Sequence, residues 1–367
     1  MEKTYRVGVI GRTGGGDYGH NLDLAWLDHS DADVVAVADG DEAGLASAAM
    51  RMEAAHTYLD YRKMLEDEQL DVVVICERWM DRHGEITLAA MEHGLHVFME
   101  KPFCRTLEEA DRIVEASERT GTKFAIAHPT HYSPKLQTLK NLIDEGKIGQ
   151  VLEYRGRGKE DHRGGSEDLQ VLGTHIMGMI RFLGGHPLWC FADVTQDGMP
   201  ITGASLVDGP EGLGPLAGDE VSAMYGMADG SHAYFGSRRN AAGKNSRYGL
   251  MVCGTEGIFE ILESPMPSLK YLGDPTWSPG RSESQWQDVS SAGIGQREPH
   301  SGPEYRGRYF QAIRDFLDSI ENDRQPLDDA REARGGLEMI HAVFESSRLG
   351  GKVDLPLSSR AHPLSLI

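Results

Sequence analysis

The chain has 367 residues, 40% of them hydrophobic and 26% charged, which is ordinary for a soluble globular protein and too long for one compact core. Its 37 lysines and arginines face 57 aspartates and glutamates, so the net charge is −20 and phosphate backbones and anionic membranes are repelled. The totals therefore predict two domains and argue against nucleic acid and membranes as partners.

The four cysteines are far apart and form no Cys-x-x-Cys pair, so neither a zinc knuckle nor a disulfide scaffold is indicated. The N-terminal residues run directly into a strand-like segment and lack the apolar region of a signal peptide. No apolar run reaches the length of a membrane span. These features predict a reduced, cytoplasmic protein.

A glycine-rich turn separates the apolar run 7–10 from a segment, 22–27, whose apolar residues recur at helical spacing. Strand, glycine turn and helix together are what dinucleotide binding needs, because the backbone can approach the pyrophosphate at the helix N-terminus. Thr13 stands where the second glycine of the usual motif belongs, so we interpret the turn as a lengthened one. The predicted cofactor contacts on it are Gly11, Arg12, Thr13, Gly14 and Gly16.

The second strand, predicted at 34–38, ends in Asp39. A carboxylate at this place can accept hydrogen bonds from the adenosine ribose and repels a 2′-phosphate, so it favours NAD over NADP. Arg12 nearby keeps NADP open as an alternative. Asp39 could instead be a turn residue within Asp39-Gly40-Asp41.

Alternating strands and helices continue to about residue 126 and predict a doubly wound parallel sheet. Residues 42–69 are predicted to be helical, 70–75 and 96–99 are predicted strands, and Gly94 suits the end of the helix between them. The last of these strands is followed by Glu100-Lys101-Pro102. Open α/β sheets bind ligands outside the carboxyl ends of their strands. The alternative is a surface turn with a solvated Lys-Glu pair.

From residue 127 the alternation stops, so we predict a first domain at 1–126 and a second at 127–367. Strands are expected at 151–157, 222–227, 231–237 and 257–262, and amphipathic helices at 309–320 and 334–348. The segment 264–308, rich in Pro, Gly and Ser, is interpreted as an excursion or flexible loop.

Several histidines of the second domain stand near acidic residues in the sequence and could line a polyol pocket, bind a metal or be structural. No pair has the spacing of a metal motif, so no metal site is predicted. Arginines of this region could hold an acidic sugar or a phosphate. The predicted substrate-binding residues are His128, His131, Tyr132, Arg163 and Asp168.

These motifs together resemble the glucose-fructose oxidoreductase / inositol dehydrogenase family (Gfo/Idh/MocA). The resemblance rests on the glycine turn, Asp39, His83 ahead of a helix and Gly-x-His-Val-x-x-Glu-Lys-Pro at 94–102. It continues through 142–149, Gly173-Thr174-His175, 253–257 and 353–357, so it covers nearly the whole chain.

The resemblance implies a Rossmann domain followed by an α+β domain with an open, mostly antiparallel sheet that pairs subunits into a homodimer or homotetramer. It implies NAD as cofactor, a sugar or polyol as substrate, and Lys101 and His175 as catalytic residues. Glu100 would lie near the nicotinamide ribose or hold Lys101. Further cofactor contacts are expected from Cys76, Arg78, His83, Glu100 and Lys101.

Two departures from the family pattern concern the partner of His175. Val171 and Gly178 stand where the family usually has aspartates, and Asp168 could replace them only if the backbone turns it inward. The segment 76–82 also lacks the usual Thr-Pro. Redox-assisted elimination or hydrolysis with retained NAD, and a regulatory protein without catalysis, are therefore kept as alternatives to a dehydrogenase.

Overall fold

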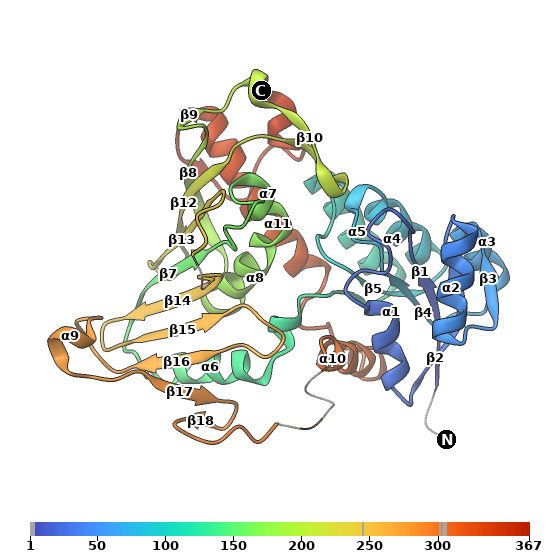
Figure 1. Ribbon diagram of the computed structural model, residues 1–367, viewed down its shortest axis with the longest axis horizontal. Coiled ribbons are helices and arrows are strands. Elements are labelled where there is room, and N and C mark those ends of the chain that lie inside the picture. Colours follow the sequence, from blue (N-terminus) through green and yellow to red (C-terminus); the bar gives the residue numbers. More distant parts are fainter. Residues whose placement is uncertain (1–3, 244–245, 301, 303–306) are drawn as a thin grey trace. The chain divides into compact units, whose positions relative to one another are not determined.

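The computed structural model describes residues 4–243, 246–300, 302 and 307–367. The chain forms two compact units, which are treated separately below (Figure 1). Unit 1 comprises Met1–His128, Pro210–Gly214 and Gly307–Arg334, and unit 2 comprises Pro129–Gly209, Pro215–Arg306 and Gly335–Ile367. Among the helices that the structure describes, none is long and apolar enough to cross a membrane.

Unit 1 is built on a parallel sheet with the strand order β3-β2-β1-β4-β5-β6. The order reverses between β1 and β4, and such switch points bind ligands at the carboxyl ends of the strands. This confirms the predicted Rossmann domain. The strands are β1 (Tyr5–Ile10), β2 (Ala32–Ala38), β3 (His56–Tyr58), β4 (Val72–Ile75), β5 (His96–Met99) and β6 (Phe124–Ile126).

Two helices of unit 1 have bounds with a clear local cause. Thr106 and Glu109 form a capping box at the start of α5, and Gly121, with φ of 70°, ends it. The Asp41 side chain accepts the Gly44 N–H at the start of α2. The helices are α1 (Leu22–Ala25), η1 (Trp26–Asp28), α2 (Glu42–Met52), α3 (Tyr61–Asp67), η2 (Met80–Arg82), α4 (His83–Glu92), α5 (Leu107–Thr120) and α10 (Phe310–Glu321).

The α10 segment lies in unit 1, although the boundary drawn from the sequence places it in the second domain. The reason is its apolar face, which packs on the Rossmann core. Phe316 makes edge contacts with Trp26 and Phe98, with ring centroids 6.3 Å and 5.5 Å away. Tertiary contacts of this kind are invisible to a boundary drawn where the strand–helix alternation stops.

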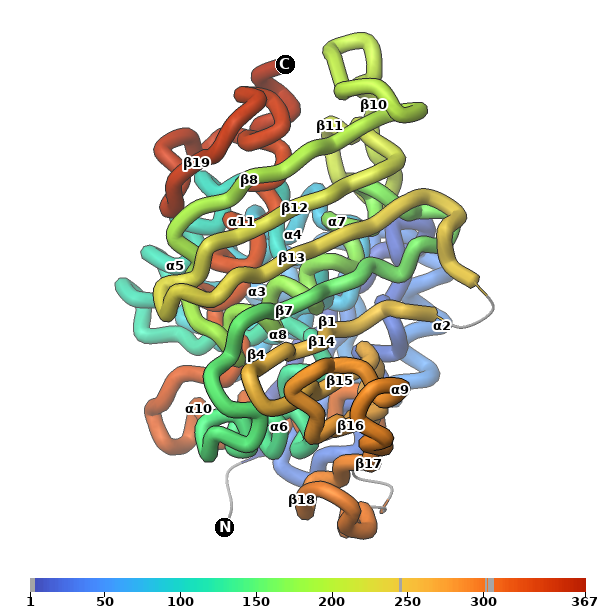
Figure 2. The backbone as a smooth tube through the Cα atoms, turned by 90° about the vertical axis from the view of Figure 1, so that its left-hand side faces the viewer, coloured from blue at the N-terminus to red at the C-terminus, as the bar shows by residue number. Residues whose placement is uncertain are grey.

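Unit 2 is built on a large sheet with the order β18-β17-β16-β15-β14-β7-β13-β12-β8-β19, with β9 paired to β8 (Figure 2). Its pairs are antiparallel except β13 with β7, which confirms the predicted mostly antiparallel sheet. The strands are β7 (Val151–Arg157), β8 (Pro187–Gln196), β9 (Met199–Pro200), β12 (Glu220–Met227), β13 (His232–Arg238), β14 (Gly249–Gly254), β15 (Ile258–Leu262), β16 (Leu269–Leu272), β17 (Gln287–Ser290), β18 (Gly293–Ile294) and β19 (Val353–Asp354).

Helix α8 packs directly against this sheet. A Cβ atom at Gly184 would lie 2.7 Å from the Tyr154 ring, so a side chain there would push the helix off β7. The remaining elements of unit 2 are η3 (Pro129–Tyr132), α6 (Pro134–Asp144), α7 (Ser166–Val171), α8 (Gly173–Gly184), η4 (Gly203–Ser205), β10 (Val207–Gly209), α9 (Pro279–Ser282) and η7 (Pro363–Leu366). The short helix η5 (Pro210–Gly212) belongs to unit 1, and β11 (Gly214–Leu216) and α11 (Ala330–Leu349) contain residues of both units.

Two predictions about local structure were wrong. Residues 42–69 are not wholly helical, because His56–Tyr58 adds an edge strand to β2. Of the two interpretations of the segment 264–308, an excursion or a flexible loop, the flexible loop is wrong, since the described residues contain β16, α9, β17 and β18. Leu269 and Leu272 are buried and β16 pairs with β15, which extends the sheet. Residues 301 and 303–306 of the segment lie outside the described part of the chain.

Candidate active site

The glycine turn after β1 folds back on itself at the carboxyl edge of the parallel sheet. Arg12 and Asp17 exchange backbone hydrogen bonds of 3.1 and 3.0 Å, and Asp17 Oδ1 accepts the Gly14 N–H at 2.9 Å. Gly16, with φ of 87°, passes so close to Arg78 that a Cβ would lie 2.6 Å from its backbone nitrogen. Gly16 thus lets Arg78 pack against the turn, whereas a Cβ at Gly14, with φ of 76°, would meet no atom within 4 Å, so the backbone at Gly14 is open to the close approach that a pyrophosphate requires. The individual glycine contacts stay a prediction.

Asp39 directly follows β2, and its carboxylate is held toward this turn. Its Oδ2 accepts hydrogen bonds from the Thr13 backbone N–H at 3.0 Å and hydroxyl at 2.7 Å, and from the Tyr18 hydroxyl at 3.0 Å. Burial, followed by the charge of Asp39, raises the pKa of Tyr18. Oδ1 accepts the Asp41 N–H at 3.0 Å, so Asp39 also stabilises its own turn. Sequence reasoning missed Tyr18.

The segment after β4 is fixed by His83. One ring nitrogen, Nδ1, lies 2.8 Å from the Pro102 carbonyl oxygen, and the other, Nε2, lies 2.8 Å from the Glu77 carbonyl oxygen. His83 thus ties the end of β4 to the turn after β5. The Glu77 carboxylate pairs with Arg82, and burial raises the pKa of the Cys76 thiol well above its usual range. The predicted cofactor contacts of Cys76, Arg78 and His83 stay predictions.

Glu100 is the centre of a buried network at the end of β5. Its Oε1 accepts from His20 Nδ1 and from the Tyr309 hydroxyl, each at 2.8 Å, and its Oε2 accepts the Lys101 backbone N–H at 2.9 Å. Burial alone would favour the neutral acid, but the His20 hydrogen bond and the Lys101 charge lower the pKa of Glu100 to about 2. Glu100 is therefore favoured as an anion at neutral pH.

The glycine turn packs closely against Glu100. A Cβ atom at Gly19, whose φ is 64°, would lie 2.7 Å from Cγ of Glu100 and 2.8 Å from the Cys76 carbonyl oxygen. His20, the next residue, donates its backbone N–H to Glu100 at 3.2 Å. This close approach connects the turn after β1 with the turn after β5.

Lys101 follows Glu100 and is 4% exposed, so the surface-turn alternative does not describe it. Its peptide bond to Pro102 is cis. Burial lowers the pKa of Lys101 below its usual range, and Arg308 and Arg78 act in the same direction, whereas Glu100 and Glu211 oppose it. A buried lysine whose proton affinity is set by its neighbours can both polarise an oxygen and exchange a proton.

In unit 2, His175 lies in the first turn of α8 and is 2% exposed. Its Nδ1 lies 3.2 Å from Oε1 of Glu263, a side chain that is 9% exposed. The Tyr248 ring also packs against the His175 imidazole in a T-shaped arrangement, with centroids 6.3 Å apart. Sequence reasoning missed Glu263, because nothing in the linear spacing connects it with His175.

The carboxylate of Asp168 is engaged elsewhere. It accepts from the Ser237 hydroxyl at 2.5 Å, the Glu160 N–H at 3.0 Å and the Lys159 N–H at 3.2 Å. Burial raises the pKa of Asp168 despite these donors. Asp168 therefore holds the chain after β7, and the carboxylate beside His175 belongs to Glu263.

His131 fills the space that a longer side chain at position 178 would need. A Cβ atom at Gly178 would lie 2.0 Å from Cε1 of His131, whose Nε2 is 3.4 Å from the His175 carbonyl oxygen. Tyr132 beside it is buried. The glycine at position 178, where the family usually has an aspartate, thus leaves room for the His131 ring to pack against α8.

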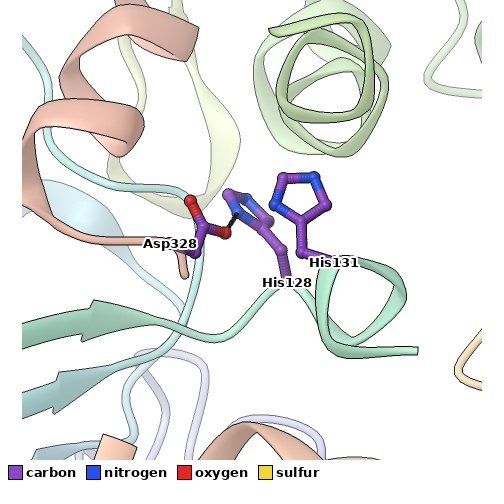
Figure 3. A group of neighbouring side chains, drawn as sticks. All are labelled: His128, His131 and Asp328. Atoms are coloured by element: carbon purple, nitrogen blue, oxygen red, sulfur yellow. Dashed lines mark hydrogen bonds and ion pairs between the residues drawn. The ribbon is translucent and has the colours of Figure 1, made fainter. Parts of the chain in front are cut away.

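Two other predicted substrate residues already have charged neighbours. His128, in unit 1, places Nδ1 2.6 Å from the Asp328 carboxylate, a partner that the sequence did not suggest (Figure 3). In unit 2, Arg163 Nη2 donates to Asp161 at 2.7 Å and lowers the pKa of that carboxyl. The roles of both residues in substrate binding stay predictions.

Two family models match the chain. The "Oxidoreductase family, NAD-binding Rossmann fold" matches residues 5–128, and the "GFO/IDH/MocA C-terminal domain" matches residues 136–260.

Similar curated proteins include the levoglucosan dehydrogenase of Pseudarthrobacter phenanthrenivorans, 29% identical over 58% of this chain, and the inositol 2-dehydrogenase of Salmonella paratyphi B, 36% identical over 35% of it. The chain spans 60% and 38% of the length of these two relatives. A solved levoglucosan dehydrogenase in complex with NADH and levoglucosan shares the fold, with a TM-score of 0.77 and 24% identity over 97% of this chain and 100% of that one.

The resemblance inferred from the motifs is confirmed by both matched domains, and the family description supports NAD as the cofactor. The chain belongs to the GFO/IDH/MocA family of NAD-binding oxidoreductases.

Proposed function

We propose that the protein transfers a hydride between nicotinamide and the carbon that bears a hydroxyl group in a sugar, a polyol or a related cyclic alcohol. The observation that carries this proposal is Lys101, a buried amine at the carboxyl edge of the Rossmann sheet, next to the buried carboxylate of Glu100. The relatives named for levoglucosan and inositol support the substrate class.

The chain's residues fit a bound dinucleotide. The turn from Gly11 to Gly19 and the carboxylate of Asp39 suit the pyrophosphate and the adenosine ribose. The nicotinamide ring, when bound, would accept or donate the hydride at C4. Lys101, as an ammonium ion, would polarise the reacting oxygen, and His175 would take or return its proton. Glu100 would hold the backbone of Lys101 in place through their hydrogen bond.

A sugar and polyol panel with NAD tests this function. A rise in absorbance at the reduced-nicotinamide band with at least one substrate is expected from a dehydrogenase. Product formation without net NADH would instead identify redox-assisted elimination or hydrolysis. Bound NAD with no turnover across the panel would favour the regulatory alternative, which rests on the departures at Val171 and Gly178.

Cofactor choice is expected to depend on the charge of Asp39. In Asp39→Asn the repulsion of a 2′-phosphate is lost, so the preference for NAD over NADP should fall about tenfold or more in kcat/KM. The matched control is Tyr18→Phe, which removes a hydrogen bond to the same carboxylate oxygen but keeps its charge. An unchanged cofactor preference in Asp39→Asn would contradict the assignment.

The large sheet of unit 2 is proposed to pair copies of the chain into a homodimer or homotetramer. Side chains that point away from α8 form a row across neighbouring strands, and Phe191 in this row is 48% exposed. The row runs through Phe191, Met224, Tyr234, Arg155 and Met251. The mass measured by light scattering distinguishes a monomer from these assemblies. The cytoplasmic location stays a prediction.

A further inference from the structure

We infer that Glu263 is the positioning residue of His175, the carboxylate that orients its imidazole and stabilises its protonated form. This inference rests on the proposed function, in which His175 exchanges the substrate proton. Glu263 lies in unit 2 directly after β15, and Nδ1 of His175 is 3.2 Å from its Oε1. Both side chains are nearly buried, at 2% and 9% exposure, so water screens their interaction little.

The position of Glu263 is determined by its own surroundings. Its backbone N–H donates to the Tyr248 carbonyl at 2.9 Å, which extends the pairing of β14 and β15 by one residue. The Thr130 hydroxyl lies 2.8 Å from both Glu263 Oε1 and the Ser264 carbonyl oxygen. A carboxylate held by a strand end and a buried hydroxyl loses little entropy when it contacts the imidazole.

Tyr248 also contacts the histidine. Its hydroxyl donates to the Leu172 carbonyl at 2.7 Å, just ahead of α8, and its ring is perpendicular to the imidazole of His175. Glu263 and Tyr248 are joined by the backbone hydrogen bond described above. The histidine is therefore fixed by elements that are separate in the sequence and adjacent in the sheet.

The other candidate positions lack a usable carboxylate. Val171 is apolar and 2% exposed, the place beside Gly178 is filled by His131, and Asp168 binds Ser237 and backbone N–H groups. Glu263 thus supplies from β15 the charge that the family pattern places on the helical segment around His175. A carboxylate 3.2 Å from Nδ1 stabilises the imidazolium by its charge, and proton exchange would then take place at Nε2.

The test compares Glu263→Gln, Glu263→Asp and the control Glu260→Gln in the full chain. Glu260 is a partly exposed carboxylate of the same strand. In Glu263→Gln we expect kcat/KM to fall about 10²-fold and the acid limb of its pH profile to move to lower pH by about one unit, because the imidazolium loses its anion. Glu263→Asp should restore most of the activity, and Glu260→Gln should behave as the wild type.

A readout that needs no substrate separates this inference from the proposed function. The imidazole titration of His175, followed by NMR with ¹⁵N-labelled histidine and assigned with His175→Gln, should shift to lower pH in Glu263→Gln. A shifted titration in a protein inactive on every substrate would contradict only the proposed function. An unshifted titration and an unshifted pH profile in a folded Glu263→Gln would overturn the role of Glu263.

Discussion

Replacing Lys101 by alanine should lower kcat by about 10³-fold, because a donor aimed at the reacting oxygen in a water-poor site contributes far more than it would in water. NAD affinity should change little, since the glycine turn and Asp39, which are proposed to bind the pyrophosphate and the adenosine ribose, follow β1 and β2 rather than β5. Stopped-flow turnover and a fluorescence titration with NADH measure the two quantities separately. Lys63→Ala is the control, because the Lys63 side chain is 58% exposed. Undiminished turnover in Lys101→Ala would remove this lysine from the mechanism.

The pH profile of kcat is a second test of the role of Lys101. Burial lowers the pKa of Lys101, so its ammonium form is lost as the pH rises through a value below 10.5. If the ammonium ion polarises the substrate oxygen, the alkaline limb of kcat should therefore fall earlier than for an ordinary lysine. In Lys101→Ala the residual activity should no longer fall on this alkaline limb. If the fall came instead from an unrelated inactivation at alkaline pH, it would remain in Lys101→Ala.

Trp26→Ala should destabilise unit 1 by about 3–5 kcal/mol, the usual cost of removing a large aromatic side chain from a packed core. Trp26 is fully buried, and its ring makes edge contacts with Phe98 of β5 and Phe316 of α10. Its loss should also loosen Tyr309, which immediately precedes α10 and donates to Glu100. Stability and catalysis are thus expected to decline together.

Urea unfolding followed by circular dichroism measures this change, with the transition of unit 1 fitted separately if two appear. Leu27→Ala is the control, because this neighbouring residue is 47% exposed and its truncation should cost less than about 1 kcal/mol. A Trp26→Ala transition that differs from the wild type by no more than the Leu27→Ala transition would show that α10 does not depend on this aromatic cluster.

The Rossmann unit was predictable because its information is local. Neighbouring residues alone predict the apolar strand β1, the glycine turn and the apolar strand β2 that precedes Asp39. The alternation of strands and helices then leaves few possible topologies for the sheet. Its edge strand β3 was missed, because three residues, two of them exposed, carry too weak a periodic signal. The strands of 264–308 were missed because they are only two to four residues long.

The candidate site was predictable where one stretch of chain carries both the position and the chemistry. Glu100-Lys101-Pro102 follows a core strand, so its place at the carboxyl edge could be inferred, and its burial agrees with that place. Tyr309 as the partner of Glu100, and Asp328 as the partner of His128, could not be inferred, because they join segments about 200 residues apart.

The sequence by itself determined the family, the two kinds of sheet and the identity of Lys101 and His175 as candidates, since these depend on local pattern and motif. Only the tertiary structure decided which charges meet: Glu263 rather than Asp168 beside His175, and α10 with the Rossmann core. The physical reason is that strand pairing and helix packing bring distant residues within about 3 Å, at which electrostatic interactions in a buried site become strong.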